Sequence, residues 1–152
     1  MTIIKEKVCV ITGAASGIGK ACARLIAAEG GRVCLTDRDA SGLEATAQEI
    51  RVLDGNVLHF QALDIRDEAA IGAFAQTILS QVGHIDVLMN IAGISTWGRV
   101  QDLSLQHWKD LININVIGVV SMLDAFLPSM IEAGKGGHVV TVSSAAGLFG
   151  LP

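Results

Sequence analysis

Short apolar runs alternate with segments of helical period along most of the chain. The runs predict five strands, at Lys7–Thr12, Arg32–Asp37, Val57–Asp64, Asp86–Asn90 and His138–Val142. Nearly continuous apolar strands are typical of a parallel sheet that is covered on both faces. Because crossovers between parallel strands are right-handed, the pattern predicts a doubly wound α/β fold with strand order 3-2-1-4-5.

The segments between the runs carry apolar residues at helical spacing, which predicts the faces that they bury. The expected inward residues are Ile18, Cys22, Leu25 and Ile26 in the first segment; Leu43, Ala47 and Ile50 in the second; Ile71, Phe74, Ile78 and Val82 in the third. A fourth segment, from about Leu105 to Ala133, is apolar nearly all round. We therefore expect it to be covered on several sides.

The composition indicates one packed domain, which we place over residues 1–152. Hydrophobic residues make up 51% of the 152 residues, and no repeat, linker or low-complexity tract interrupts them. The net charge is −4 with no basic cluster, which disfavours binding to nucleic acid or an anionic membrane. The apolar stretch Ile112–Ile131 contains Asp124 and Pro128 as well as two asparagines, which favours a buried helix over a membrane span.

Cysteine and histidine usage points to a reducing compartment and no metal. Cys9, Cys22 and Cys34 lie in apolar stretches without a Cys-x-x-Cys pair, as reduced buried thiols do. The four histidines are too dispersed for a helical metal pair, so we assign no metal. The first ten residues lack the apolar core of a signal peptide, and we expect a cytoplasmic protein.

A glycine-rich turn joins the first strand to the first helix, with the sequence Thr12-Gly13-Ala14-Ala15-Ser16-Gly17-Ile18-Gly19. Glycines allow a sharp turn and a close backbone approach, and the helix N-terminus that follows favours a bound pyrophosphate. A ligand-free turn is the plain alternative. A P-loop is disfavoured, because its first glycine would fall on Ala14 and its Ser/Thr on Ala21.

This Thr-Gly-x-x-x-Gly-Ile-Gly segment resembles the signature of the short-chain dehydrogenase/reductase family, and the resemblance extends from Lys7 to Pro152. It implies a Rossmann-type domain that binds a nicotinamide dinucleotide. The cofactor-binding residues implied in the turn are Gly13, Ser16, Gly17, Ile18 and Gly19.

Asp37 closes the second predicted strand, 24 residues after Gly13. A carboxylate there can accept hydrogen bonds from both hydroxyls of the adenosine ribose and would repel a 2′-phosphate. An ordinary turn aspartate is the alternative. Arg38 could accommodate the phosphate of NADP, but the glycine turn has Ser16 where a basic residue would support NADP. We therefore expect NAD, with NADP as the less favoured cofactor.

Two further strand ends resemble cofactor contacts of the family. Asp64-Ile65 resembles an Asp–hydrophobic pair at the adenine edge, although a turn before the next helix fits almost as well. The segment Asn90-Ile91-Ala92-Gly93 resembles the family's Asn-Asn-Ala-Gly motif beneath the cofactor ribose, with Asn90, Ala92 and Gly93 as matching residues. Ile91 departs from that motif. A buried asparagine at a strand end normally ties neighbouring strands together.

Two catalytic residues are implied by the resemblance. Asn115 falls on an expected inward stripe of the fourth helix, which consists of Trp108, Leu111, Ile112, Val119 and Leu123. A buried amide there is either a satisfied core asparagine or, as the resemblance implies, the residue that holds a water in a proton relay. Asn113 is the weaker candidate. Ser144, in Ser143-Ser144-Ala145-Ala146-Gly147, matches the catalytic serine that would hydrogen-bond the reacting oxygen.

The family's Tyr-x-x-x-Lys motif should follow about thirteen residues after that serine, beyond Pro152, and the chain has no tyrosine. We therefore expect the front part of a longer enzyme, with a fold incomplete at its C-terminal side and no activity in these 152 residues alone. The intact protein is expected to transfer hydride between NAD and a secondary alcohol or ketone, as a homo-oligomer. A catalytically inactive nucleotide-binding or regulatory half-domain and a purely structural module are the alternatives.

Overall fold

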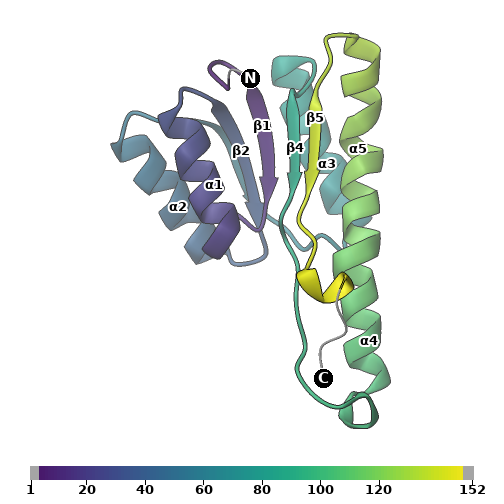
Figure 1. The fold of residues 1–152 in the computed structure, drawn as a ribbon. Coiled ribbons are helices and arrows are strands. Elements are labelled where there is room, and N and C mark those ends of the chain that lie inside the picture. The colour runs from purple at the N-terminus through teal and green to yellow at the C-terminus, as the bar shows by residue number, and fades with distance from the viewer. Residues whose placement is uncertain (1–3, 149–152) are drawn as a thin grey trace.

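Five parallel strands form one sheet in the order β3-β2-β1-β4-β5, as predicted. The computed structural model describes residues 4–148. The strands are β1 (Val8–Thr12), β2 (Arg32–Asp37), β3 (Asn56–Ala62), β4 (Val87–Asn90) and β5 (His138–Thr141). Their chain order reverses between β1 and β4, which lie side by side in the middle of the sheet (Figure 1). This is the Rossmann-type arrangement expected from the sequence.

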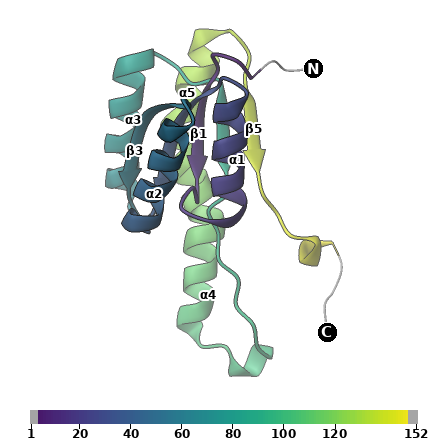
Figure 2. The ribbon, with the colours of Figure 1, turned by 90° about the vertical axis from the view of Figure 1, so that its left-hand side faces the viewer.

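Helices cover the two faces of the sheet in the way that right-handed crossovers require. Two helices, α1 (Gly17–Ala28) and α2 (Ala40–Val52), lie on one face. The other face carries α3 (Glu68–Val82) and a long helical stretch made of α4 (Leu105–Ile112), the π-turn η2 (Asn113–Ile117) and α5 (Gly118–Ala133) (Figures 1 and 2). Two short 3-10 turns, η1 (Val100–Asp102) and η3 (Ala145–Gly147), complete the described elements.

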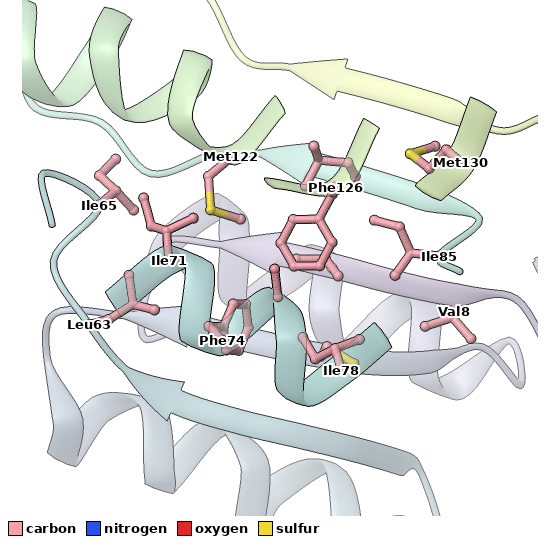
Figure 3. Packing of buried hydrophobic residues seen from close by; sticks show 14 of the residues in the cluster. Val8, Leu63, Ile65, Ile71, Phe74, Ile78, Ile85, Met122, Phe126 and Met130 are labelled. Carbon is pink, nitrogen blue, oxygen red and sulfur yellow. The ribbon is translucent and has the colours of Figure 1, made fainter. Parts of the chain in front are cut away.

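Each face of the sheet has its own apolar core. Between the sheet and α3 and α5, the rings of Phe74 and Phe126 meet edge to face, with centroids 6.1 Å apart (Figure 3). Ile71, Ile78 and Met122 pack around them. The predicted inward faces of α2 and α3 are confirmed, with Val82 only partly buried. The other core lies between the sheet and α1 and α2.

The predicted inward face of α1 is only partly confirmed, because Cys22 and Ile26 are partly buried. Ile18 and Leu25 are 60% and 64% exposed, whereas Gly19, Ala23 and Ala27 are buried. The fully buried residues are all small, so α1 can approach the strands closely, while Ile26 packs at the margin of the core and the bulkier Ile18 and Leu25 are exposed. A periodicity search that looks for large apolar side chains misses such a face.

The fourth helical stretch has the predicted span, but the predicted inward stripe is only partly confirmed: Leu111, Val119 and Leu123 are partly buried, and other residues are the most buried ones. Its buried residues recur every fourth position, at Ile114, Gly118, Met122, Phe126 and Met130. Trp108 and Ile112 of the expected stripe are 40% and 52% exposed, because α4 extends past the end of the sheet (Figure 1).

Only one face of this stretch is covered by residues 4–148, not several as expected. The stretch has 29 residues. Judged by length and composition alone, it is long and apolar enough to cross a membrane. In this fold one face of the stretch packs against α3 and the sheet.

Candidate functional site

A cavity of about 470 Å³ opens at the carboxyl ends of the strands, beside the point where the strand order reverses. Most of the predicted cofactor residues line it: Gly13, Ser16, Gly17, Ile18, Gly19, Asp37, Arg38, Asp64, Ile65, Ala92 and Gly93. The sheet thus brings together segments that are far apart in the sequence, since the carboxyl ends of parallel strands share one edge.

The glycine turn lines the cavity, and two of its glycines have no room for a Cβ atom. Gly13 has a φ of +72°, and a Cβ there would lie 2.9 Å from the backbone N and Cα of Ala92. A Cβ on Gly19 would lie 2.0 Å from the carbonyl oxygen of Gly13. The turn therefore depends on glycine at both positions.

Helix α1 begins at Gly17, directly at the cavity. Its N-cap residue, Ser16, has extended backbone and accepts no side-chain capping hydrogen bond from the described residues. The first N–H groups of a helix have no partner inside the helix, so those of α1 remain available to a ligand. Together with the positive end of the helix dipole, they form a seat for an anion.

Asp37 lies at the end of β2, beside this seat. Its Oδ2 accepts a hydrogen bond from the backbone N–H of Ala15 at 3.0 Å, and its Oδ1 accepts one from Asp39 at 3.0 Å. The carboxylate thus holds the glycine turn in place. Because an ionised carboxylate has about four lone-pair positions, each oxygen keeps capacity for another donor, such as a sugar hydroxyl.

Asp64 also lines the cavity, and its carboxylate accepts more hydrogen bonds than that of Asp37. Arg66 donates Nε to both carboxylate oxygens at 3.0 Å and Nη2 to Oδ2 at 2.6 Å, and its backbone N–H reaches Oδ1 at 3.0 Å. The Arg66 guanidinium holds the pKa of Asp64 below its usual range. On its other side, Nη1 of Arg66 contacts Asp110 of α4 at 3.2 Å.

Thr12 joins β1 to the segment after β4, a role that the sequence analysis did not assign. Its Oγ1 accepts hydrogen bonds from the backbone N–H groups of Ile91 and Ala92, both at 3.0 Å. Asn90 was expected to make such a tie. It is 2% exposed and does not line the cavity, and its amide atoms have no partner among residues 4–148. The position of Thr12 directly before Gly13 was the available signal.

Asn115 is exposed rather than buried, so the expectation of a core amide is wrong. It lies in the π-turn η2, where its Oδ1 accepts from the N–H of Ile94 and its Nδ2 donates to the carbonyl oxygen of Ile94, both at 2.9 Å. This pair of hydrogen bonds fixes the segment after Gly93, which lines the cavity. π-turns inside α-helices are frequent at functional sites.

Ser144 is exposed and follows β5, where it precedes η3. Its Oγ accepts a hydrogen bond from the N–H of Ala146 at 3.1 Å. The side chain does not line the cavity, so residues 4–148 do not bring Ser144 into the same pocket as the cofactor candidates.

The fold and this site together define a dinucleotide-binding α/β protein. The anion seat at α1, the carboxylate at the end of β2 and the glycines under the cavity fit an adenosine dinucleotide. Within residues 4–148, no group of three or more His, Cys, Asp or Glu side chains could hold a metal ion. The family profile described as short chain dehydrogenase matches residues 7–152, and the chain belongs to that family.

Relatives and solved structures agree with this assignment. Dehydrogenase/reductase SDR family member 7B of Danio rerio is 36% identical over 158 residues, a match that covers 98% of this chain and 50% of the relative. D-threitol dehydrogenase of Mycolicibacterium smegmatis is 39% identical over 140 residues, covering 92% and 53%. The chain thus spans about half the length of these curated relatives.

The fold is also similar to two short-chain oxidoreductases solved with bound cofactor. A metagenomic enzyme in complex with NADP is 38% identical with a TM-score of 0.90, and the match covers 99% of this chain and 67% of that one. An enzyme of Burkholderia phymatum in complex with NAD is 32% identical with a TM-score of 0.94, covering 100% and 54%. Both kinds of nicotinamide dinucleotide are therefore found on this fold.

Proposed function

We propose that this chain is the cofactor-binding part of a longer NAD-dependent oxidoreductase, which transfers hydride between the nicotinamide and a secondary alcohol or ketone. The remainder of the polypeptide would supply the tyrosine and lysine of the family's motif, since these 152 residues contain no tyrosine. We also propose that the intact protein is a homo-oligomer.

The observation that carries the choice of NAD is the position of Asp37. Its carboxylate lines the cavity at the end of β2 and is held against the glycine turn by the Ala15 N–H. Fixed there, it can accept hydrogen bonds from ribose hydroxyls and repels a phosphate on the same sugar. Arg38 also lines the cavity and is the residue that would favour NADP.

The roles of the other residues follow from their contacts. The N–H groups of α1 and the glycine turn would hold the pyrophosphate. Thr12 and Asn115 fix the segment after β4, which would lie beneath the nicotinamide half. Ser144 would donate a hydrogen bond to the reacting oxygen. The bound nicotinamide supplies or accepts the hydride.

Titration of NADH and NADPH into the purified protein, followed by nicotinamide fluorescence, tests the proposal. We expect NADH to bind at least about 10-fold more tightly, because one charge-assisted hydrogen bond is worth roughly that factor. In the Asp37→Ser variant the preference should disappear, through weaker NADH binding and stronger NADPH binding.

Glu44→Ser is the matched control, since Glu44 is an exposed carboxylate of α2 that does not line the cavity. It should leave both affinities within about twofold, which separates a local effect from a change in net charge. Equal affinity for the two cofactors in the unsubstituted protein would contradict the NAD assignment. Binding of neither by folded protein would contradict the dinucleotide site itself.

A further inference from the structure

Helix α4 contributes no residue to either apolar core. It has eight residues, none of them buried by residues 4–148, and it packs mainly on η2, the π-turn that follows it. A helix this short is marginally stable in water on its own, so its stability depends on the contacts at its ends. Its far end continues into η2, where Ile114 lines the cavity and Asn115 holds Ile94. The hydrogen bonds at the start of α4 therefore bear on an element that ends at the cavity.

The start of α4 is a capping box that has a histidine where glutamate or glutamine is usual. The N–H of His107 donates to Oγ of Ser104 at 3.3 Å, and the N–H of Ser104 donates to Nδ1 of His107 at 3.2 Å. Because Nδ1 accepts, the ring is neutral and carries its proton on Nε2. Glutamine does not titrate and glutamate takes up a proton only near about pH 4, whereas an imidazole does so as the pH falls below about 6.5.

The charged side chains near this box come from three elements. On α4 itself Lys109 and Asp110 follow, and Asp110 is paired at 3.2 Å with Arg66 of the loop before α3. Asp102, at the end of η1, is exposed, and η2 contains no charged residue. His107 lies in the first turn of α4, where the positive end of the helix dipole disfavours a further cation.

We propose that His107 is a pH-sensitive cap, so that α4 is well formed at neutral pH and opens more often when the ring is protonated. A protonated Nδ1 is a donor and cannot accept from the Ser104 N–H, which removes one half of the capping box. Because the folded helix favours the neutral ring, its stabilising contribution is complete well above about pH 6.5 and is lost as the pH falls below that value.

Amide hydrogen exchange of the ¹⁵N-labelled protein at about pH 7.5 and about pH 5.5 tests the proposal. Protection factors, which correct for the intrinsic dependence of exchange on pH, are compared for residues 109–112 and for Met122 and Phe126 on the buried face of α5. We expect the protection of residues 109–112 to be lower by about three- to fivefold at the lower pH, as the loss of a capping hydrogen bond predicts. Met122 and Phe126 should keep their protection.

Three variants make the result specific. His107→Gln keeps a side-chain acceptor that does not titrate, so α4 should be equally protected at both pH values. His107→Ala has no acceptor, and α4 should be less protected at both. His84→Gln, in the loop before β4, is the matched control and should keep the pH dependence of the unsubstituted protein.

A fall of the same size in His107→Gln would overturn the role of His107, and so would equal protection of residues 109–112 at both pH values in the unsubstituted protein. If Met122 and Phe126 lose protection to the same extent as residues 109–112, the loss is global rather than local, and the proposal is overturned as well. Because no ligand is added, the outcome does not depend on whether the protein binds a dinucleotide.

Discussion

At the scale of single residues, the function of a side chain in this protein is set by its neighbours rather than by its type. Asp37 and Asp64 both lie near strand ends and line the same cavity. Asp37 accepts hydrogen bonds from two backbone N–H groups, whereas Asp64 is paired with the Arg66 guanidinium and also accepts its backbone N–H. Their positions were predicted from the sequence; the partner of Asp64 was not, because nothing in a motif states where a flexible arginine will point.

The three cysteines provide a test at this scale. Burial raises the pKa of the Cys9 and Cys34 thiols to about 12, and both side chains are fully buried. At pH 8 only about one molecule in 10,000 would carry a thiolate at either position, even before access is considered. Cys22 on α1 is only half-buried. We expect one fast-reacting thiol when the folded protein is treated with 5,5′-dithiobis(2-nitrobenzoate).

The control for this experiment is the Cys22→Ser variant, which should lose the fast phase entirely. In denaturant all the thiols should react, three in the unsubstituted protein and two in the variant. Fast reaction of two or three thiols in the folded protein would contradict the burial of Cys9 and Cys34.

At the scale of elements, strands were easier to predict than helix faces. All five strands lie where apolar runs predicted them. For β1, β2 and β4 this is because a strand buried on both faces needs apolar residues at nearly every position, whereas β3 and β5 lie at the edges of the sheet and are less buried. The fully buried residues of α1 were missed because Gly19, Ala23 and Ala27 are small. The stripe on the fourth helical stretch was only partly predicted because α4 extends past the sheet, so an apolar residue there is not necessarily buried.

An ion pair between Lys7 and Asp86 joins the start of β1 to the start of β4. It predicts that the free energy of unfolding depends on pH. Burial alone would raise the pKa of Asp86, but hydrogen bonds from the Lys7 ammonium at 2.8 Å and the Val8 N–H at 2.9 Å outweigh it and lower the pKa. A carboxyl group whose pKa is lowered by folding stabilises the fold at neutral pH, and this contribution is lost as the pH falls below about 4.

Asp86→Asn should therefore reduce the free energy of unfolding at pH 7 by about 1–3 kcal/mol. The difference from the unsubstituted protein should shrink between pH 5 and pH 3, as measured by urea denaturation at several pH values. Asp102→Asn, at an exposed residue of η1, is the control and should have little effect. A difference that stays constant down to pH 3 would contradict an ionic contribution.

At the scale of the whole molecule, the exposed apolar residues among 4–148 include sets on the edge strand and on the long helical stretch. One set lies on the edge strand β5, where Val139 and Val140 are 42% and 39% exposed. The other lies on the long helical stretch, at Ile112, Val116 and Val120. Unpaired parallel edges and contiguous apolar faces favour association. We predict that this chain self-associates with increasing concentration, as measured by light scattering after size-exclusion chromatography.

A charged residue on the edge strand should weaken this association, so Val140→Lys is expected to shift the protein toward monomer. Val52→Lys is the matched control and should change nothing, since Val52 is 71% exposed at the end of α2, which packs against β3 and β2 at the edge of the sheet opposite β5. A single monomeric species with a sharp cooperative thermal transition at all concentrations would contradict the prediction.

The sheet order and the location of the site were predictable from the sequence because both follow from topology. Alternating strands and helices predict the order 3-2-1-4-5, and that order places the glycine turn and Asp37 at one edge. The tie through Thr12 and the clamp of Asn115 on Ile94 were not predicted, since each joins segments that lie far apart in the chain. Such contacts exist only once the backbone is in place.

The central claim is that the backbone between residues 13 and 19, together with Asp37, binds a nicotinamide dinucleotide. The most direct test is a titration of the ¹⁵N-labelled protein with NADH, followed by amide chemical shifts. We predict that the largest shifts occur at the amides of Gly13, Gly17 and Gly19 and around Asp37, and saturate with a single dissociation constant. If the chemical shifts of these amides do not change at saturating NADH, or if the largest changes occur elsewhere, the claim is contradicted.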